Sequence, residues 1–450
     1  LYTSGSTGNP KGVKMPGSGL VNLLSWQDKQ FVNKNRKVLQ FTSLNFDVSF
    51  QEIFSTLCFG STLCLISADR RIDMTEVVND ISRYGITHLF VPYIVLKNLS
   101  EIIAEQTFSS SLPLEQIITA GEQLKVTDDI KAVVSNGISI VNQYGPTEAH
   151  VVSSYKLDDS KELPSLPPIG KPIDNTQLYI LNEDLKPVPV GVNGELFIGG
   201  VQIARSYLNL PDLTNEKFIK DPFSKYPDAR LYRTGDMAKW LSDGNIEYSG
   251  RSDDQIKIRG YRVELGEIES ILQQHESVNK AVIIAKDDNA GNKRLIAYVV
   301  PEDSFGKEEI ISYIRAKLPE YMVPSVWVEV ENIPLTANGK VNKRALPDPD
   351  FTTGLSGNYE EPRNETEKKL ASIWQDLLGL GQIGIHDNFF ELGGHSLLAT
   401  RAVSAIRKEF SVNIPIKSLF EFTSIADLGK YLDLIKSNKE IDDESEAFDL

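Results

Sequence analysis

The segment from Thr3 to Gly12 combines residue types that suit phosphate binding, with hydroxyl groups, glycines and one lysine within ten residues. Glycines let backbone N–H groups approach phosphate oxygens, hydroxyl groups add donors, and Lys11 supplies a point charge. The segment does not have the G-x-x-x-x-G-K-S/T spacing of a Walker A loop. We therefore expect a phosphate loop of another kind, and the alternative is a flexible Gly/Ser turn.

The segment from Asp387 to Leu397 is the most specific short motif of the sequence, and it contains Ser396. Apolar residues recur at helical spacing after this serine, so its simplest interpretation is the N-cap of a helix. A helix start also exposes the hydroxyl group and favours an incoming phosphodiester. His395 lies beside it, but no second His or Cys stands at metal-ligand spacing, so no metal site is predicted there.

The bulk composition is that of an ordinary globular protein with 41% hydrophobic and 24% charged residues. At 450 residues the chain should hold about three folding units. The net charge of −15 argues against nucleic acid as a partner, and no apolar run approaches the length of a membrane span. Cys58 and Cys64 are the only cysteines, which excludes a disulfide framework and fits a cytoplasmic location.

The elements that must position these residues are predicted from the spacing of apolar residues. Short apolar runs alternate with helical segments from Val38 to Val141, which indicates α/β layers around a largely parallel sheet. Strands and turns dominate beyond Asp174, including a hairpin around Asp243 and Gly244. A smaller α+β unit follows, then a Pro/Gly-containing linker, and then about 75 residues with the helical spacing of a four-helix domain.

Five motifs in order resemble those of the adenylate-forming superfamily. The phosphate loop comes first, and residues 142–148 resemble the nucleotide and magnesium motif. Residues 232–236 resemble the ribose motif. Residues 250–260 resemble the hinge segment, and residues 335–340 resemble the loop with the catalytic lysine. Together they span about 340 residues.

The motif around Ser396 resembles the phosphopantetheine attachment site of peptidyl carrier domains. The chain as a whole therefore resembles part of a nonribosomal peptide synthetase, and it starts inside a motif without Met, so we expect a truncated adenylation domain. The resemblance implies a multidomain fold: an α/β large subdomain with a β-rich part, a small α+β subdomain and an all-α four-helix carrier domain. The expected boundaries are 1–253, 254–350, a linker at 351–362, 363–437, and an acidic tail or linker at 438–450.

The resemblance also implies roles for individual residues. The β- and γ-phosphates would be held by Thr3, Ser4, Thr7 and Lys11, and the α-phosphate by Thr147. The remaining nucleotide contacts would come from Gly121, Glu122, Asn142, Tyr144, Gly145, Asp236 and Arg251. Glu148 would bind Mg²⁺, Asp253 would be the hinge, and the catalytic set would be Lys340, Thr147 and Lys11.

Plainer interpretations exist for three of these residues. Lys340 beside Asn-Gly is by itself an exposed turn lysine. Asp236 could cap a turn at a hairpin edge, and Glu148 could be a solvated carboxylate at a helix start. The order of the motifs favours the functional interpretation in each case.

The amino-acid pocket, again by resemblance, would consist of Asp47, Val48, Gln51, Tyr93, Ile118, Ala120, Gln143, Val151 and Val152, with Lys340 at its far end. A carboxylate and a lysine at opposite ends suit a zwitterionic amino acid. No other charge lines the pocket, so a neutral substrate is expected. The set resembles a proline pocket, but Gln143 stands where histidine is expected, so a substituted proline or another neutral side chain stays open.

The expected function is ATP-dependent adenylation of an amino acid and its transfer to the phosphopantetheine of the carrier domain. The cofactors would be ATP, Mg²⁺ and 4′-phosphopantetheine. The partners would be the amino acid, a phosphopantetheinyl transferase and neighbouring condensation or other synthetase domains, with neither nucleic acid nor membrane. The alternatives are an acyl- or aryl-CoA ligase and an inactive module that only presents the carrier, and inactivity of this fragment alone also stays open.

Overall fold

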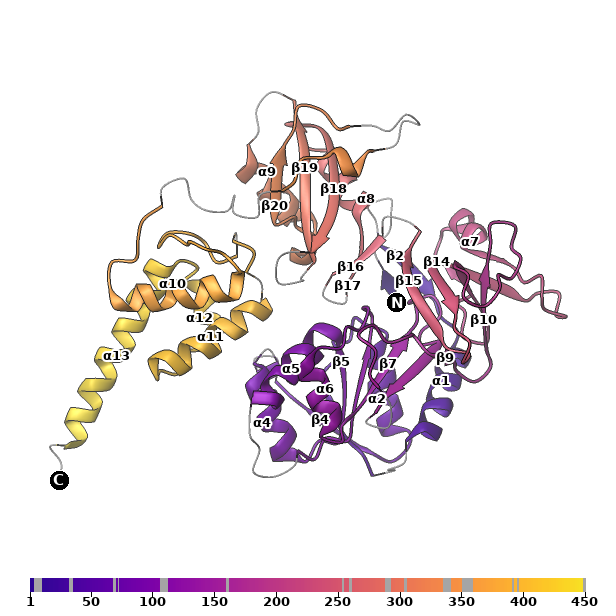
Figure 1. The fold of residues 1–450 in the computed structure, drawn as a ribbon, viewed down its shortest axis with the longest axis horizontal. Coiled ribbons are helices and arrows are strands. Elements are labelled where there is room, and N and C mark those ends of the chain that lie inside the picture. The colour runs from indigo at the N-terminus through magenta and orange to yellow at the C-terminus, as the bar shows by residue number, and fades with distance from the viewer. Residues whose placement is uncertain are drawn as a thin grey trace. The chain divides into compact units, whose positions relative to one another are not determined.

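The computed structural model, shown in Figure 1, describes residues 1–3, 10–31, 35–67, 70–71, 73–105, 112–158, 162–252, 255–258, 261–287, 293–302, 306–334, 341–349, 359–390, 392–394 and 396–447. The chain divides into two compact units, Leu1–Glu267 and Ile268–Leu450. The division falls within helix α8 (Leu265–Leu272). No helix in the described part of the chain has both the length and the apolar character needed to cross a membrane.

A largely parallel sheet is the centre of the first unit. Its described strands run in the order β4-β3-β5-β6-β7-β8-β9, and all neighbours from β4 to β7 are parallel. The strands are β3 (Lys37–Gln40), β4 (Thr62–Leu65), β5 (His88–Pro92), β6 (Gln116–Ala120), β7 (Ser139–Tyr144), β8 (Ser153–Leu157) and β9 (Lys171–Pro172). The alternation of apolar runs and helical segments had predicted this arrangement, and the structure confirms it.

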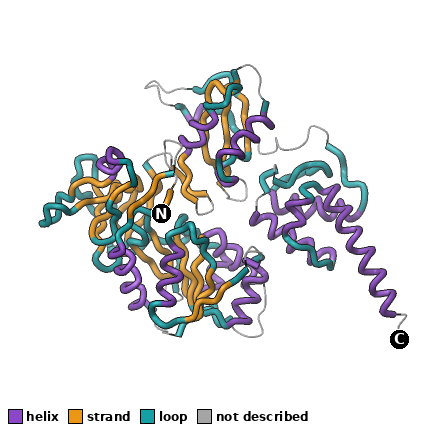
Figure 2. The backbone as a smooth tube through the Cα atoms, turned by 180° about the vertical axis from the view of Figure 1, so that it is seen from behind, coloured by secondary structure: helices purple, strands orange, loops and turns teal. Residues whose placement is uncertain are grey.

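Helices cover both faces of this sheet (Figure 2). Because successive side chains of a strand point to opposite faces, Ile117 and Ile118 of β6 belong to different apolar clusters. The cluster of Ile117 includes side chains of α4 (Met74–Tyr84), α5 (Tyr93–Glu105) and α6 (Asp128–Ser135). The helices packed beside the other face are α1 (Gly17–Gln30) and α2 (Val48–Leu57), and Val48 packs against the cluster of Ile118.

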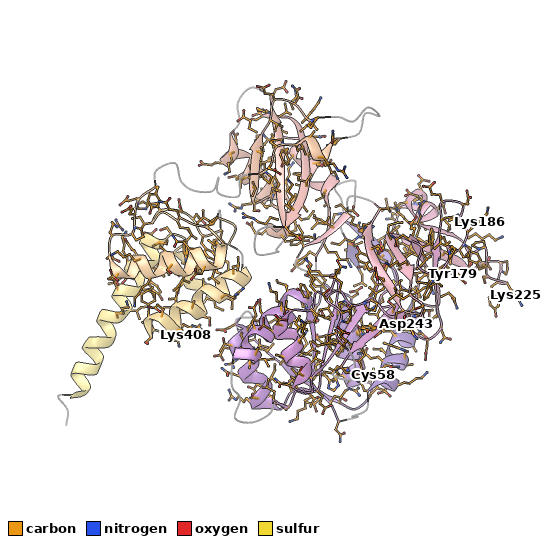
Figure 3. All side chains as sticks on the ribbon, viewed as in Figure 1. Cys58, Tyr179, Lys186, Lys225, Asp243 and Lys408 are labelled. Atoms are coloured by element: carbon orange, nitrogen blue, oxygen red, sulfur yellow. The ribbon has the colours of Figure 1, made fainter. Side chains whose placement is uncertain are left out.

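An antiparallel sheet forms the β-rich part of the first unit. Its strands run in the order β10-β11-β14-β13, and β15 pairs with β14. The elements are β10 (Thr176–Leu181), β11 (Gly194–Gly200), α7 (Pro211–Lys217), β13 (Phe218–Lys220), β14 (Arg230–Trp240) and β15 (Ile246–Arg251). Asp243, labelled in Figure 3, accepts the backbone N–H of Asn245, and Gly244 has φ +80°, so the predicted hairpin turn is confirmed.

Two short antiparallel pieces complete the first unit. Strand β2 (Lys11–Lys14) lies between β1 (Tyr2–Thr3) and β12 (Ser206–Tyr207). Strands β16 (Gln255–Ile258) and β17 (Tyr261–Glu264) form a hairpin in which Lys257 stands opposite Arg262. This hairpin contributes charged side chains to the candidate site.

The second unit begins with a small α+β part, as the sequence predicted. Strands β18 (Val278–Asp287) and β19 (Lys293–Pro301) are antiparallel, and β20 (Val326–Glu329) runs parallel to β19. Helix α9 (Lys307–Lys317) and the 3₁₀ turns η1 (Glu320–Met322) and η2 (Lys343–Ala345) accompany them. Ile296 and Tyr298 of β19 are fully buried in the apolar core of this part.

The described residues from 359 to 447 include four helices: α10 (Glu365–Leu378), α11 (Ser396–Phe410), α12 (Lys417–Glu421) and α13 (Ile425–Ala447). Asn364 caps α10 by accepting the N–H of Glu367, and Gly379 ends it at φ +67°. Trp374 is fully buried, and its ring lies 4.9 Å from that of Phe389. The helical fold of this part is confirmed.

The acidic stretch at 438–450, predicted as a tail or linker, is helical as far as Ala447. No Gly or Pro follows Gly429 to end helix α13. The predicted domain boundaries themselves stay predictions.

Candidate active site

The carboxyl ends of the parallel strands bring several predicted site residues to one edge of the large sheet. Pro92 of β5 pairs in register with Ala120 of β6, which pairs with Gln143 of β7. The residues that follow these three at the same edge are Tyr93, Gly121 and Tyr144. Ligands of open α/β sheets bind outside the carboxyl ends of the strands.

A cluster of three buried glutamines lies among the predicted pocket residues. Gln51 of α2 donates through Nε2 to Oε1 of Gln27 at 2.7 Å and to Oε1 of Gln143 at 3.0 Å. Gln27 lies on α1, and all three side chains are buried. Oε1 of Gln51 and Nε2 of Gln27 have no hydrogen-bond partner among the described residues. The cluster is therefore neutral, and it can still accept a hydrogen bond at Oε1 of Gln51 and donate one from Nε2 of Gln27.

The apolar residues assigned to the pocket lie in three separate clusters. Ile118 and Val48 share the cluster on the α1/α2 face of the sheet. Val151 packs with Leu23 and Trp26 of α1, whereas Val152 lies in the core of the β-rich part. Tyr93 packs against the opposite face, and burial, together with the charge of Glu122, raises the pKa of Tyr93.

Asp47 begins helix α2, and its Oδ1 accepts the N–H of Val48 at 2.9 Å. Its backbone oxygen accepts the N–H of Phe50 at 3.0 Å and lies 3.0 Å from Nε2 of His150. The residue that the resemblance assigns to the substrate ammonium is thus held by its own helix and by a side chain distant in sequence.

Asp236 forms a buried carboxylate site on β14. It stands opposite Arg251 in the register of β14 and β15, and Nη1 of Arg251 donates to its Oδ1 at 2.8 Å. Tyr144 Oη donates to its Oδ2, and burial, followed by the charge of Asp236, raises the pKa of Tyr144, so that the hydroxyl keeps its proton. A carboxylate has about four lone-pair positions, so both oxygens can still accept hydroxyl groups. Asp236 is therefore a buried carboxylate that can accept hydrogen bonds from a ligand, and in its described contacts it does not cap a turn at the edge of the hairpin.

Glu148 is fully buried and surrounded by positive and hydroxyl groups. Nη1 of Arg262 donates to its Oε2 at 2.9 Å, and Tyr207 Oη donates to its Oε1 at 2.6 Å. Burial alone would raise the pKa of Glu148, but the charges of Arg262 and Lys11 lower it to about 2. The carboxylate is therefore ionised inside the protein and is not the solvated group of the plainer interpretation.

The residues around Glu148 fit a hard cation held largely by phosphate oxygens. Mg²⁺ is usually bound by one or two carboxylates plus phosphates, and Glu148 supplies one ionised carboxylate. No group of three or more His, Cys, Asp or Glu side chains that could hold a metal occurs in the described part of the chain. Arg262 contacts both oxygens of Glu148, so a cation at this carboxylate would compete with it.

Two predicted phosphate ligands lie on β1 and β2. The hydroxyl of Thr3 is buried and has no partner among the described residues, which suits a ligand. Lys11 is buried, and its Nζ lies 3.8 Å from Oε1 of Glu264. Burial, followed by the charge of Arg262, lowers the pKa of Lys11.

The segment after β7 is shaped by close backbone packing. A Cβ on Gly145 would lie 1.6 Å from the backbone oxygen of His150, so only glycine fits there. Asn142 is buried and donates to the backbone oxygen of Pro168 at 2.9 Å, which makes it a structural support of the segment. Thr147 is half-buried in the turn before Glu148.

Four predicted residues, Ser4, Thr7, Asp253 and Lys340, lie outside the described residues. Ser396 is the first residue of α11, at the helix start that the sequence predicted. Gly394, two residues before Ser396, packs closely against Phe389. A Cβ at Gly394 would lie 2.3 Å from Cδ1 of that ring.

Sequence reasoning missed Gln27, His150, Tyr207 and Arg262. Arg262 would have been a candidate only once the hairpin was known, because it stands opposite Lys257, and like charges in that position are destabilising unless an anion lies nearby. The other three carry no local signal, since each acts through a contact with a distant segment.

Comparison with protein families gives three matches along the chain. Residues 1–208 match the AMP-binding enzyme family, residues 267–340 the AMP-binding enzyme C-terminal domain, and residues 368–432 the phosphopantetheine attachment site. ATP with Mg²⁺ and 4′-phosphopantetheine are the cofactors of these families.

Curated relatives cover nearly the whole chain. Gramicidin S synthase 2 of Brevibacillus brevis is 46% identical over 436 residues, which are 96% of this chain and 10% of that protein. Tyrocidine synthase 2 of Brevibacillus parabrevis is 45% identical over 96% of this chain and 12% of its own length. The chain thus spans about a tenth of these relatives.

Solved structures share the fold. An NRPS protein containing adenylation and PCP domains, bound to a vinylsulfonamide inhibitor, has a TM-score of 0.79 and 24% identity over 96% of this chain and 72% of its own. The adenylation domain AlmE of Vibrio cholerae, in complex with glycyl-adenosine-5′-phosphate, has a TM-score of 0.66 and 26% identity over 76% of this chain and 64% of its own.

Proposed function

We propose that the chain belongs to the AMP-binding enzymes of nonribosomal peptide synthesis, and that it activates one neutral amino acid and loads it onto its phosphopantetheine attachment region. The observation that carries the proposal is the buried Asp236, held between Arg251 and Tyr144 with acceptor positions to spare. A site of this kind suits the two hydroxyl groups of a ribose. It lies in the same unit as the ionised Glu148 and the buried hydroxyl of Thr3.

The first half-reaction joins the amino acid to AMP. The substrate carboxylate attacks the α-phosphorus of ATP, the bond to the bridging oxygen breaks, and pyrophosphate leaves. Such a step needs positioning and charge neutralisation more than a protein nucleophile. Thr3, Lys11 and Thr147 contact the phosphates, and Lys340 neutralises charge between the two reactants. Mg²⁺, when bound beside Glu148, adds charge neutralisation of the phosphates.

The second half-reaction moves the aminoacyl group to the carrier. A phosphopantetheine attached to this chain would supply the thiol that accepts the acyl group, with AMP as the leaving group as the acyl–phosphate bond breaks and the thiol proton passing to water or a base. Ser396 is the attachment point, because it lies in the matched region at the start of α11. A phosphopantetheinyl transferase is the partner that this role requires, and condensation or other synthetase domains are the neighbours.

The pocket favours a neutral side chain. Gln27, Gln51 and Gln143 form a hydrogen-bonded cluster without net charge, and a charged side chain buried against it would lack a counter-charge. Asp47 supplies the carboxylate for the ammonium group. Proline, a substituted proline or another neutral amino acid of similar size fits this description. A cytoplasmic location is proposed with it, because both described cysteines are free thiols.

The test is amino-acid-dependent exchange of pyrophosphate into ATP by the full-length protein, measured across a panel of amino acids. One neutral amino acid should stimulate exchange well above the rest, and after phosphopantetheinylation it should be found as a thioester on Ser396. Ser396→Ala should keep the exchange and lose the thioester. Exchange stimulated only by other carboxylic acids, with free CoA as acceptor, would favour the acyl- or aryl-CoA ligase, and no exchange at all would favour an inactive carrier-presenting module.

A further inference from the structure

His150 occupies an unusual backbone conformation between the predicted metal ligand and the predicted pocket wall. Its φ is +56°, a left-handed value that non-glycine residues seldom adopt because the backbone crowds Cβ there. The residue is buried, and its backbone oxygen fills the space that a Cβ on Gly145 would need. Such conformations persist only where the surroundings hold them, and they cluster at functional sites.

Both ring nitrogens of His150 are engaged by backbone groups. Nδ1 accepts the N–H of Val151 at 3.0 Å, and Nε2 lies 3.0 Å from the backbone oxygen of Asp47. An amide N–H can only donate and a carbonyl oxygen can only accept. Both contacts are hydrogen bonds only in the neutral ring with its proton on Nε2, so the partners determine the tautomer.

The contact joins two segments that are 103 positions apart. On one side, Asp47 starts helix α2, and its backbone oxygen also accepts the N–H of Phe50. On the other side, the backbone oxygen of Val151 accepts a hydrogen bond from Nε2 of Gln202 at 2.7 Å. The backbone next to His150 is therefore held in place as well. The imidazole is thus a rigid spacer between an anchored loop and the residue that carries the ammonium-binding carboxylate.

We propose that His150 is a positioning residue for amino-acid recognition: its Nε2–H holds the backbone of Asp47 and so fixes the carboxylate against the substrate ammonium. The inference rests on the proposed function. The described contacts of the His150 side chain are with the backbone of Asp47 and Val151, neither of which is predicted to bind the nucleotide, so its effect should be confined to the amino acid.

Two substitutions separate the contact from the backbone conformation. Asparagine tolerates positive φ well, and its Oδ1 can accept the N–H of Val151, but its side chain is too short to reach Asp47. Glutamine is long enough to donate to Asp47, but it cannot accept from Val151 in the same pose. His150→Asn therefore removes the proposed contact and keeps the local fold, whereas His150→Gln keeps the contact.

The experiment is pyrophosphate exchange by the full-length protein with its best amino acid. His150→Asn should raise the KM for the amino acid about tenfold, the effect of losing one hydrogen bond, and leave the KM for ATP within about twofold. His150→Gln should restore most of the amino-acid KM. Melting temperatures of both variants, measured alongside, should stay close to that of the native protein.

Three results would overturn the inference. The first is an unchanged amino-acid KM in His150→Asn. The second is an equal rise in both KM values, which would indicate a general structural role, and the third is a failure of His150→Gln to improve on His150→Asn. If the native protein exchanges with no amino acid, the proposed function fails first and this inference with it.

Discussion

Arg262 and Glu148 form a buried ion pair, with Nη1 of the arginine 2.9 Å from Oε2 of the carboxylate. The glutamate side chain is fully buried, and the arginine is only 15% exposed. The hairpin of β16 and β17 thereby neutralises the carboxylate that resemblance assigns to Mg²⁺. Removing one partner of such a pair leaves a buried charge, whereas the pair itself adds little net stability.

Arg262→Leu should therefore destabilise the first unit by about 3 kcal/mol, because Lys11 and Tyr207 would be the remaining partners of the Glu148 side chain among the described residues. The measurement is thermal unfolding of the full-length protein with and without Mg²⁺. Mg²⁺ should raise the melting temperature more in Arg262→Leu than in the native protein, since the cation no longer competes with the arginine.

Two variants serve as controls for Arg262→Leu. Arg262→Lys keeps the charge and should lose less stability. Arg233→Leu breaks a more exposed pair with Glu195 and should cost about 1 kcal/mol or less. If Arg262→Leu unfolds like the native protein, the described ion pair is energetically unimportant. If Mg²⁺ raises both melting temperatures equally, the cation does not compete with Arg262 for Glu148.

Asp236→Asn should weaken ATP binding specifically. The substitution keeps the shape of the side chain but removes its charge, which leaves Arg251 without its anion and one oxygen replaced by a donor. We expect the KM for ATP to rise about tenfold or more in pyrophosphate exchange, with the amino-acid KM within about twofold. Asp243→Asn, in the exposed turn of the same hairpin, should change neither value. Equal KM values in Asp236→Asn and the native protein would exclude Asp236 from the nucleotide site.

His88 should make the stability of the first unit depend on pH. Burial, followed by the charge of Arg36, lowers the pKa of His88 from 6.5 to about 4. Between these values the unfolded chain binds a proton that the folded protein does not, so stability is complete above about pH 6.5 and is lost as pH falls towards 4. The loss from this one residue should reach about 3 kcal/mol.

Unfolding of His88→Gln and the native protein between pH 7 and 5 measures this contribution. The variant should show a shallower dependence on pH, although its stability at pH 7 can be lower because the ring packs against Phe31. His386→Gln removes a histidine that is 55% exposed and should leave the slope unchanged. A slope in His88→Gln as steep as in the native protein would show that other groups control the acid sensitivity.

Local sequence information predicted the helices and strands but not the polar side-chain contacts between distant segments. The spacing of apolar residues predicted the parallel sheet, and Asp243 with Gly244 predicted the hairpin turn. Both predictions were possible because turn preferences and side-chain periodicity depend on only a few neighbouring residues. The partnership of Glu148 with Arg262 spans 114 positions, and that of Gln27 with Gln51 spans 24. No periodicity encodes such pairs. Only the fold brings them together, so the sequence could place Glu148 in a motif but could not tell that it is buried.

Ser396→Ala should abolish phosphopantetheine attachment without unfolding the helical region. The full-length protein, incubated with CoA, Mg²⁺ and a broad-specificity transferase, should gain one phosphopantetheine, located at Ser396 by mass spectrometry of its peptides. The serine begins α11, where a helix start favours the phosphodiester, and alanine has a higher helix propensity than serine, so the substitution should not unfold the helix. Ser404→Ala, on an exposed position of the same helix, should be modified like the native protein. Modification that persists in Ser396→Ala, or a folded native protein that stays unmodified, would contradict the assignment of the carrier region to this serine.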